Sequence, residues 1–356
     1  MAGRKKILLV TGSMNQTIQM AKVAGELKEY ECWFSQIFSD SALLNLARKH
    51  TTLLDKTIIA EKYRRQSEAY LETLGYAIDY RAERNSYDMV ICCSDLIVPK
   101  RLRATRTLWV QEGMIDKPTW ITWLVKRLRL PPSLCFNTSL NGATNTCDIY
   151  CAASEGYKAH IAAMGTDAHK IYVTGIPNYD NLAVHVGNDF PYKGYVMVAT
   201  TDMRETARFE NRAAFIRKCV TIAGGRQLLF KLHPNENFGR AIREIRRYAP
   251  ASALIYTDGN TNDMIANCCE LITQYSTVVY TGIALGKKVH SRFDLRELET
   301  LVPVQNNGTA AKNIATICRK YLESGQDAAA FAREFRYDAP VHAYDHYLSI
   351  PSSYAG

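Results

Sequence analysis

Short apolar runs that end in small or polar residues recur along the whole chain. The run at 6–12 ends in Gly12, and a polar stretch that starts at Ser13 precedes an amphipathic segment at 18–30. An apolar run of this length is typical of a parallel strand buried on both faces, and the amphipathic segment predicts a helix. A long and mostly polar helical pattern is expected over 41–84. The other strands predicted in the first half of the chain are 87–94, 106–113, 147–154 and 170–174.

The same alternation of strand and helix begins again after residue 193. A turn that contains Gly175 and Pro177, followed by the polar stretch 181–193, separates the two halves. Strands that alternate with helices in both halves indicate an α/β fold class with two facing doubly wound, Rossmann-like domains. The elements predicted beyond the linker are strands at 194–201, 227–232, 253–256, 270–273 and from 288, and helices at 209–222, 262–267 and 278–285.

We expect three parts in the chain. A length of 356 residues is enough for two domains that each bury a core. Residues 1–182 are predicted to form an N-terminal Rossmann-like domain, and residues 183–330 a second one. Residues 331–356, entered through a predicted helix at 327–335, are expected to pack back across the cleft between the domains.

Composition and charge narrow the class of protein. The chain is 47% hydrophobic and 22% charged, which is ordinary for a soluble globular protein. Its formal net charge of +9 suits a phosphate-bearing ligand or an anionic membrane surface, and nucleic acid fits that charge too. The basic residues are dispersed, however, and no nucleic-acid recognition motif is present, so we expect no nucleic-acid partner.

The cysteines and the apolar runs indicate a protein of the cytoplasm. The ten cysteines lack the spacing of zinc ligands, so we expect buried, reduced thiols and no metal site. The apolar run near the N-terminus is too short for a signal peptide. No later run approaches the roughly 20 apolar residues of a spanning helix. The expected location is therefore cytoplasmic.

The segment 119–132 combines Trp120, Trp123, several aliphatic residues and three cations. This composition suits a membrane interface, with the tryptophans at headgroup depth and the cations on anionic lipid. An ordinary helix that packs on the sheet and has a solvated basic edge explains the segment equally well. On the first interpretation, residues 120–129 attach the protein peripherally to the inner face of the membrane.

Polar residues follow three of the strands predicted in the second half, and the carboxyl ends of parallel strands are where open α/β sheets bind ligands. Hydroxyl and N–H groups before a helix hold phosphate, and an arginine grips it bidentately. A surface ion pair is the competing interpretation of the arginine. The candidate residues are Thr200, Thr201, Arg204, His233, Pro234, Ser276 and Thr277.

Two turns of the first half carry further candidates. Glu112 and Gly113 end the strand at 106–113, so the carboxylate can act as a general base while the glycine lets a substrate approach. Capping of the next helix explains Glu112 as well. Gly12 and Ser13 form a turn that either binds a ligand at a helix N-terminus or only redirects the chain.

Three sequence motifs together resemble the glycosyltransferase-B superfamily: Lys-Leu-His-Pro at 231–234, Ile-Thr-Gln-Tyr-Ser-Thr at 272–277 and Ala-Leu-Gly-Lys-Lys-Val at 284–289. The likeness is to the branch that holds capsule and teichoic-acid polymerising transferases and the sialyl- and Kdo-transferases with a His-Pro motif. It implies that His233 contacts the phosphate of the donor and that Ser276 and Thr277 cradle it. Gln111-Glu112-Gly113 is similar to the carboxylate-Gly pair that serves the acceptor as base in that group, with Gln in place of an acid at the first position.

The resemblance implies a metal-independent glycosyltransferase without a cofactor. Its substrate would be a nucleotide-activated sugar, and its acceptor a glycan or lipid-linked precursor of a cell-surface polysaccharide. Because the candidate phosphate ligands all lie in the second half, the base would have to come from across the cleft.

Two alternatives stay open. The turn at 174–180 and the loop at 200–205 also resemble UDP-N-acetylglucosamine 2-epimerases, which implies an epimerase or a nucleotide-sugar hydrolase. Those enzymes usually carry paired glutamates after an Asp-Ser-Gly-Gly motif, whereas no acid occurs here between Thr277 and Asp294, and this favours transfer. A non-catalytic module that binds nucleotide or glycan is the other alternative.

Overall fold

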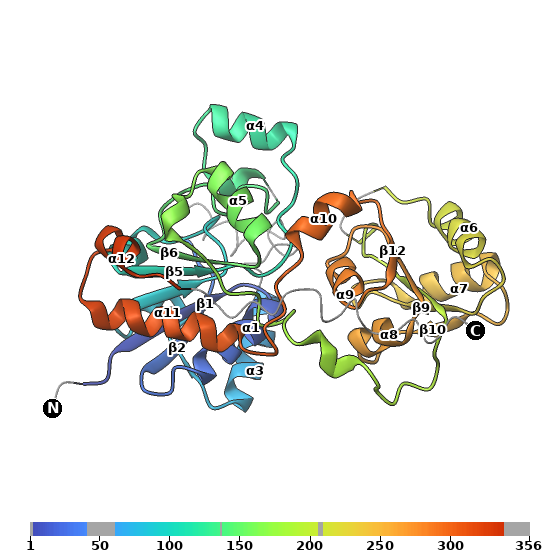
Figure 1. The fold of residues 1–356 in the computed structure, drawn as a ribbon, viewed down its shortest axis with the longest axis horizontal. Helices are drawn as coiled ribbons and strands as arrows, with labels where there is room; N and C mark the ends of the chain where they lie inside the picture. The colour runs from blue at the N-terminus through green and yellow to red at the C-terminus, as the bar shows by residue number, and fades with distance from the viewer. Residues whose placement is uncertain (1–2, 41–60, 136, 206–208, 338–356) are drawn as a thin grey trace. The chain divides into compact units, whose positions relative to one another are not determined.

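The computed structural model describes residues 3–40, 61–135, 137–205 and 209–337, and it consists of two compact units. The first unit comprises the described residues up to Asp180 together with those from Gly308 onward, and the second comprises Asn181–Asn307. Each unit is built around one parallel β-sheet (Figure 1). The chain therefore leaves the first unit, forms the second and then returns to the first.

The sheet of the first unit has seven strands in the order β3-β2-β1-β4-β5-β6-β7, and every neighbouring pair is parallel. The central strands β1 and β4 are apolar runs whose side chains are buried on both faces, which is why their sequences do not alternate between apolar and polar. The strands are β1 Lys6–Thr11, β2 Glu31–Gln36, β3 Ala77–Ile78, β4 Met89–Cys92, β5 Arg106–Val110, β6 Ile149–Ala152 and β7 Ile171–Val173.

Helices α1 (Met14–Gly25) and α11 (Ala310–Ser324) pack together on one face of this sheet. Met20 of α1 and Ile314 of α11 belong to the same buried core as Leu9 of β1. The other helices of this unit are α3 Glu61–Thr73, α4 Trp120–Arg127, α5 Glu155–Met164 and α12 Ala328–Glu334, and the short 3-10 turns are η1 Tyr80–Ala82, η2 Lys100–Ala104, η3 Pro132–Cys135 and η4 Ala168–Lys170.

The sheet of the second unit has five parallel strands in the order β10-β9-β8-β11-β12. One face of it forms a core with α6 and α7. The strands are β8 Val196–Ala199, β9 Leu228–Lys231, β10 Leu254–Tyr256, β11 Glu270–Thr273 and β12 Lys288–His290; the helices are α6 Arg212–Ala223, α7 Phe238–Tyr248, α8 Thr261–Asn267, α9 Val278–Ala284 and α10 Leu295–Leu301, with the 3-10 turn η5 Leu182–His185. Within the described residues, no helix is long and apolar enough to cross a membrane.

Helix α9 lies close against β11 and β12 because Gly282 has no side chain. A Cβ atom at this position would lie 2.6 Å from Leu271 Cδ2 and 2.9 Å from Val289 Cγ2. Both distances are shorter than packed carbon atoms adopt, so a larger residue would push the helix away from the sheet. This contact determines how closely α9 packs on β11 and β12.

In each unit, a hydrogen bond connects the two chain segments that link this unit to the other unit. In the first unit, Ala310 N donates a hydrogen bond of 2.8 Å to Asp180 Oδ2. In the second unit, Leu182 N donates a hydrogen bond of 3.1 Å to Gln305 Oε1. The points where the chain leaves and re-enters each unit are therefore tied to one another within that unit.

The predicted domain limits differ from these two units. Residues 308–330 were expected in the second domain, but α11 packs against α1 and shares the core of the first sheet. An amphipathic helix needs an apolar surface, and the sequence pattern does not say which of two sheets supplies it. Helix α12 also lies in the first unit, where the Phe331 ring packs against Tyr321 at a tilt, with centroids 5.0 Å apart. Residues 338–356 of the predicted tail lie outside the described residues.

Two local predictions in the first unit need correction. The helix expected at 18–30 is α1, which begins at Met14 because the Ser13 side chain accepts a hydrogen bond from Gln16 N and caps it. It ends at Gly25 and is followed by β2, which the pattern did not predict. Of the helical pattern at 41–84, residues 41–60 lie outside the described residues. Helix α3 ends at Thr73 and is followed by the short edge strand β3.

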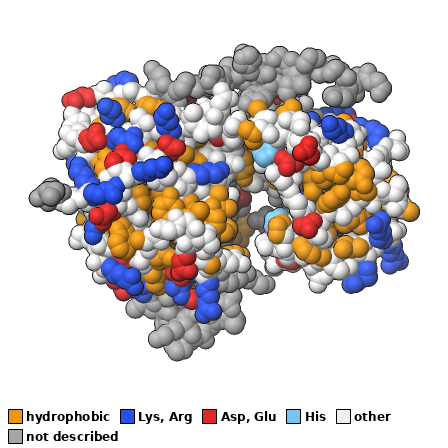
Figure 2. Space-filling view, turned by 90° about the horizontal axis from the view of Figure 1, so that it is seen from below, with side chains coloured by type: hydrophobic (Ala, Val, Ile, Leu, Met, Phe, Trp, Pro, Cys, Tyr) orange, Lys and Arg blue, Asp and Glu red, His pale blue; other side chains and the backbone are white. Residues whose placement is uncertain are grey.

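On the face of the molecule that Figure 2 shows, the cationic side chains do not gather in one stripe. On the face that Figure 2 shows, Lys and Arg side chains alternate with acidic and apolar ones.

Glu270, the first residue of β11, is a buried carboxylate held by three basic side chains. Arg226 Nη1 lies 2.7 Å and Lys288 Nζ 3.3 Å from Oε1, and His290 Nε2 lies 2.7 Å from Oε2. Burial acts to raise the pKa of Glu270, but the hydrogen bonds from Arg226, His290 and Lys288 outweigh it and lower the pKa from 4.5 to about 2.

We expect Glu270 to stabilise the protein above pH 4.5 and to lose this contribution as the pH falls toward about 2, because its pKa is lower in the folded than in the unfolded chain. Glu270→Gln should lower the urea midpoint at neutral pH, and its difference from wild type should shrink below pH 4.5. Urea titrations across this pH range measure the effect, with the exposed Glu299→Gln as control. A difference that stays constant with pH would contradict the prediction.

Candidate functional site

The carboxyl ends of the strands in the second unit bring the polar candidates to one edge of the sheet. Strand β8 lies between β9 and β11. His233 N donates to the Thr200 hydroxyl at 3.0 Å, and the Thr201 hydroxyl donates to Gln274 Oε1 at 3.3 Å. The loop after β9 and the turn after β11 are thus connected through the two threonines that follow β8.

Glu236 holds the His233 loop from the interior of the unit. Its side chain is buried, and Oε2 accepts hydrogen bonds from His233 N at 3.0 Å and from the Thr200 hydroxyl. Its other oxygen accepts from Nη2 of Arg212, which is also buried and donates to Thr201 O at 3.3 Å. One carboxylate therefore joins the start of α6 to the ends of β8 and β9.

A second carboxylate, Glu210, extends this buried ion network. Arg212 Nε donates to Glu210 Oε2 at 2.9 Å, and Arg204 Nε lies 3.3 Å from the same oxygen. Burial raises the pKa of Glu210, while Arg212 and Arg204 act in the opposite direction. Arg204 also forms a bidentate pair with Glu244, with both N···O distances 2.8 Å. Arg204 therefore forms ion pairs within the protein, as the competing interpretation expected. We do not include it among the phosphate ligands proposed below.

The His233 ring is held in one tautomer by its own loop. Its Nδ1 accepts the N–H of Asn235 at 3.2 Å, so in the neutral ring the proton lies on Nε2. Asp202 Oδ2 accepts from Asn235 Nδ2 at 3.0 Å and lies 3.8 Å from Nδ1 of the ring. Pro234 beside it is exposed. The half-buried His233 side chain is thus oriented to offer Nε2–H as a donor.

Ser276 and Thr277 are half-buried and lie directly before α9. Ser276 Oγ accepts from Val278 N at 3.5 Å. Thr277 already has helical φ and ψ angles of −64° and −16°, and its hydroxyl does not cap the helix. The first turn of α9, which lies wholly within the described residues, contains no acidic residue. This turn therefore presents two hydroxyl groups without a carboxylate.

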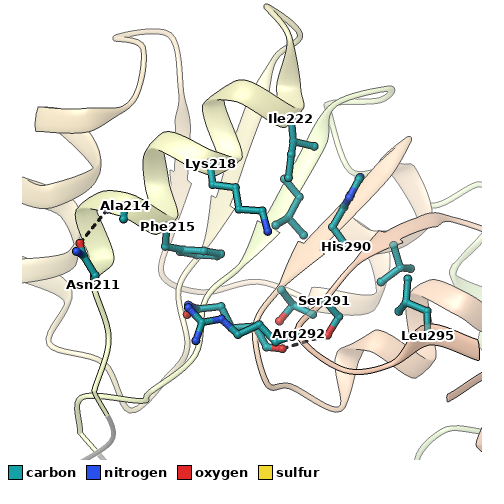
Figure 3. A pocket seen from close by; sticks show the side chains of 13 residues that line it. Asn211, Ala214, Phe215, Lys218, Ile222, His290, Ser291, Arg292 and Leu295 are labelled. Carbon is teal, nitrogen blue, oxygen red and sulfur yellow. Dashed lines mark hydrogen bonds between the residues drawn. The ribbon is translucent and has the colours of Figure 1, made fainter. Parts of the chain in front are cut away.

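A pocket of about 340 Å³ lies between α6 and the ends of β11 and β12. Figure 3 shows Phe215 and Lys218 directed into it from α6, with Ser291 and Arg292 on the strand side. Gln274 lines it as well and is only 1% exposed, and its amide nitrogen has no hydrogen-bond partner within the described residues. Among the described residues that line the pocket, none is Asp or Glu. Its charge and size suit an anionic small molecule.

In the first unit, the start of α1 surrounds the Glu112 carboxylate. Ser13 Oγ and Asn15 Nδ2 each donate to Oε1 at 3.1 Å, and Gln16 Nε2 donates to Oε2 at 2.6 Å. Asn178 Nδ2 in turn donates to Asn15 Oδ1 at 2.9 Å. The carboxylate is half-buried, and both of its oxygens are held in a fixed direction. It contacts an earlier helix, α1, rather than the next helix that the capping interpretation named.

The backbone of the two candidate glycines is used inside the first unit. Gly12 N donates to Gln16 Oε1, and Gly12 O accepts from Gln36 Nε2, both at 2.6 Å. Gly113 O accepts from Gln111 Nε2 at 2.9 Å. These bonds hold the two turns around Glu112, so the glycines support the carboxylate, and the Gly12 amide is engaged within the protein.

All ten cysteines are free, and eight of them are buried as expected. Cys269 is exposed, contrary to that expectation, because it precedes β11 at the surface. Within the described ranges, no group of three or more His, Cys, Asp and Glu side chains is placed to hold a metal ion.

Solved structures share this architecture, although no protein-family model and no curated protein sequence matches the chain. A Listeria monocytogenes protein assigned as a UDP-N-acetylglucosamine 2-epimerase has a TM-score of 0.58 at 14% identity, over 91% of this chain and 98% of that one. Staphylococcus aureus MnaA with UDP has a TM-score of 0.53 at 15% sequence identity, over 89% of this chain and 97% of that one. The Neisseria meningitidis UDP-GlcNAc 2-epimerase bound to UDP-GlcNAc has a TM-score of 0.51 at 14% sequence identity, over 88% of this chain and 100% of that one.

At this level of identity the likeness establishes the fold. Two parallel sheets with interleaved helices, and the likeness to these structures, confirm the predicted fold class, an α/β protein with two Rossmann-like domains.

Several residues of the site were not recognised in the sequence. Glu236 lies two residues after the Lys-Leu-His-Pro motif, and the sequence assigned no role to it or to Arg212, Lys218 and Arg292. The Glu236 position carried a usable signal, because an acid three residues after a strand-end histidine can reach back to the loop amide as it does in an Asx-type or capping turn. Arg212 carried no such signal, since its partner lies 24 residues away.

We expect Glu236→Ala to lower the free energy of unfolding by about 3–5 kcal/mol, because it removes one of the two carboxylates that neutralise the buried Arg212 and leaves only Glu210. Urea unfolding measures this loss. Arg65→Ala is the control, since it removes an ion pair with Glu61 whose arginine side chain is 77% exposed, and such a pair is worth about 0–1 kcal/mol. Equal losses in the two variants would show that the Glu236 pair does not organise the loop.

Proposed function

We propose that this protein is a metal-independent glycosyltransferase that moves a sugar from a nucleotide-activated donor to a glycan or lipid-linked acceptor, a precursor of a cell-surface polysaccharide. The observation that carries the proposal is His233. Its loop is fixed by the buried Glu236, and its tautomer leaves Nε2–H free to donate at the carboxyl edge of the second sheet. A positioned donor of this kind stabilises the phosphate that leaves when a glycosidic bond breaks.

The donor is proposed to bind to the second unit. His233, Ser276 and Thr277 meet its phosphates with one ring N–H and two hydroxyls. Lys218 and Arg292 at the neighbouring pocket add positive charge. Thr200 and Thr201 connect the loop after β9 to the turn after β11. These groups take the place that a divalent cation holds in metal-dependent transfer. Two of the similar solved structures hold UDP and UDP-GlcNAc, which supports a nucleotide sugar as the ligand class.

Glu112 is the base that we assign to the acceptor. In the transfer step, an acceptor oxygen forms a bond to the anomeric carbon, and the bond from that carbon to the donor phosphate breaks. The electron pair leaves with the nucleotide, and the acceptor proton goes to Glu112. A carboxylate whose direction is fixed by Ser13, Asn15 and Gln16 meets the requirement of a base for defined geometry.

A UDP-N-acetylglucosamine 2-epimerase or a nucleotide-sugar hydrolase is the second candidate. The similar folds named above favour it. Removing the proton beside the anomeric carbon needs an acid–base group near the donor, and the described first turn of α9 supplies no carboxylate for this purpose. Transfer is therefore preferred. Incubation of UDP-N-acetylglucosamine without acceptor separates the two, because an epimerised sugar would appear only with the second activity.

We expect His233→Ala to slow nucleotide release from a donor by about 100-fold, because a single preorganised donor to developing negative charge is worth this much. The measurement is nucleotide release across CMP-, CDP-, UDP- and GDP-activated sugars. His169→Ala, an exposed histidine of the first unit, is the matched control and should keep the wild-type rate. Equal rates for wild type and His233→Ala would overturn the assignment. Donor binding without turnover throughout the panel would instead indicate a non-catalytic module.

We expect Glu112→Gln to lower turnover by about 100-fold or more while nucleotide still raises the melting temperature as in wild type, since general-base catalysis contributes about 10²–10⁴-fold. Asn15→Ala is the control, because it removes one donor to the carboxylate and keeps the carboxylate itself. Its turnover should fall less than that of Glu112→Gln. A melting temperature that drops with no change in turnover per folded molecule would assign Glu112 a structural role alone.

A further inference from the structure

Helix α4 and the residues that follow it divide into a buried and an exposed side. Thr122 and Val125 are buried. Val125 packs with Cys135 and Leu140 in a small hydrophobic cluster separate from the main cores. Figure 1 shows α4 at the outer end of its unit, beyond α5 and away from the sheet. The helix therefore presents one side to the protein and the other to solvent.

The orientation of α4 is fixed by hydrogen bonds as well as by packing. Thr119 and Thr122 form a reciprocal capping box at its start. The Thr122 hydroxyl also lies 2.7 Å from Ser139 Oγ. Because these bonds hold the helix by its buried side, the set of side chains that faces solvent is defined.

The exposed side of this segment is apolar to an unusual degree. Trp120 is 74% exposed and Trp123 is 62% exposed. Six of the twelve large hydrophobic side chains exposed in the described residues lie within residues 120–134. Contiguous exposed apolar surface of this kind marks a site of interaction. The six are Trp120, Trp123, Leu124, Leu128, Leu130 and Leu134.

The charges beside these apolar side chains are all positive. Lys126, Arg127 and Arg129 are exposed, and the Arg127 guanidinium lies 5.5 Å from the centre of the Trp123 ring. Asp116 is the only acid between Gly113 and Cys135, and its Oδ2 accepts hydrogen bonds from Thr138 N and Oγ1 at 3.0 and 2.9 Å. This contrasts with the mixed charges on the face seen in Figure 2.

We propose that this α4 surface, formed by the six apolar residues together with Lys126, Arg127 and Arg129, docks on an anionic lipid bilayer. Tryptophan rings settle at headgroup depth, leucines enter the acyl boundary, and cations contact lipid phosphates. The cations that border the tryptophans are the charge complement of an anionic lipid surface. The proposal does not depend on the proposed enzymatic function, because it rests on residues to which that function assigns no role and is tested without substrate.

The test is flotation of the full-length protein with vesicles of phosphatidylcholine alone or mixed with phosphatidylglycerol. Wild type should bind the anionic vesicles, bind phosphatidylcholine weakly, and release as salt is raised. Trp120→Ala with Trp123→Ala, and separately Lys126→Glu with Arg127→Glu, should each weaken binding by about 10-fold or more. Tryptophan emission of the wild type should shift to shorter wavelength on anionic vesicles.

The matched controls lie in the second unit. Phe209→Ala removes an aromatic side chain that is 89% exposed, and Arg243→Glu reverses an exposed charge. Both should bind vesicles as wild type does. All substituted positions are exposed, so unchanged thermal unfolding should accompany every variant. Vesicle binding unaffected by either α4 double variant would overturn the proposal. So would a wild-type dimer in sedimentation that the tryptophan variant dissociates, because the α4 surface would then belong to a second copy of this chain.

Discussion

The arrangement of the carboxyl edge of the second sheet depends on one buried carboxylate, that of Glu236. A buried charge without partners costs several kcal/mol, so Glu236 is satisfied at the same time by Arg212, the Thr200 hydroxyl and the His233 amide. These three groups come from α6, the end of β8 and the end of β9. The position of the His233 ring is therefore decided by electrostatics inside the unit, before any ligand arrives.

The two units use carboxylates at their sheet edges in different ways. Glu236 is buried and fully paired, so it organises the loop around it and is shielded from a substrate. Glu112 is half-buried, so it has greater access to solvent than Glu236. Its hydrogen bonds come from neutral side chains at the start of α1, which stabilise its charge less than an arginine does. The first arrangement suits a structural role, and the second is compatible with proton transfer.

The sequence predicts the alternation of strands and helices because parallel strands buried on both faces are visible as uninterrupted apolar runs. It also places His233 and Ser276 at one edge, since carboxyl ends of parallel strands lie together. It does not reveal the pairing of Arg212 with Glu236, because the side chains that neutralise a buried charge are set by packing and not by spacing. For the same reason it assigns α11 to the wrong sheet. Strand β2, beginning with Glu31, was missed because its run is half polar.

The return of the chain to its first unit after Asn307 makes the second unit an insertion in the first. Its two ends lie together, joined by the hydrogen bond from Leu182 N to Gln305 Oε1. The first unit, in contrast, lacks one helix of its core until α11 has been synthesised. All described residues of the second unit are therefore synthesised before α11, so the last core helix of the seven-stranded sheet is translated only after the second unit.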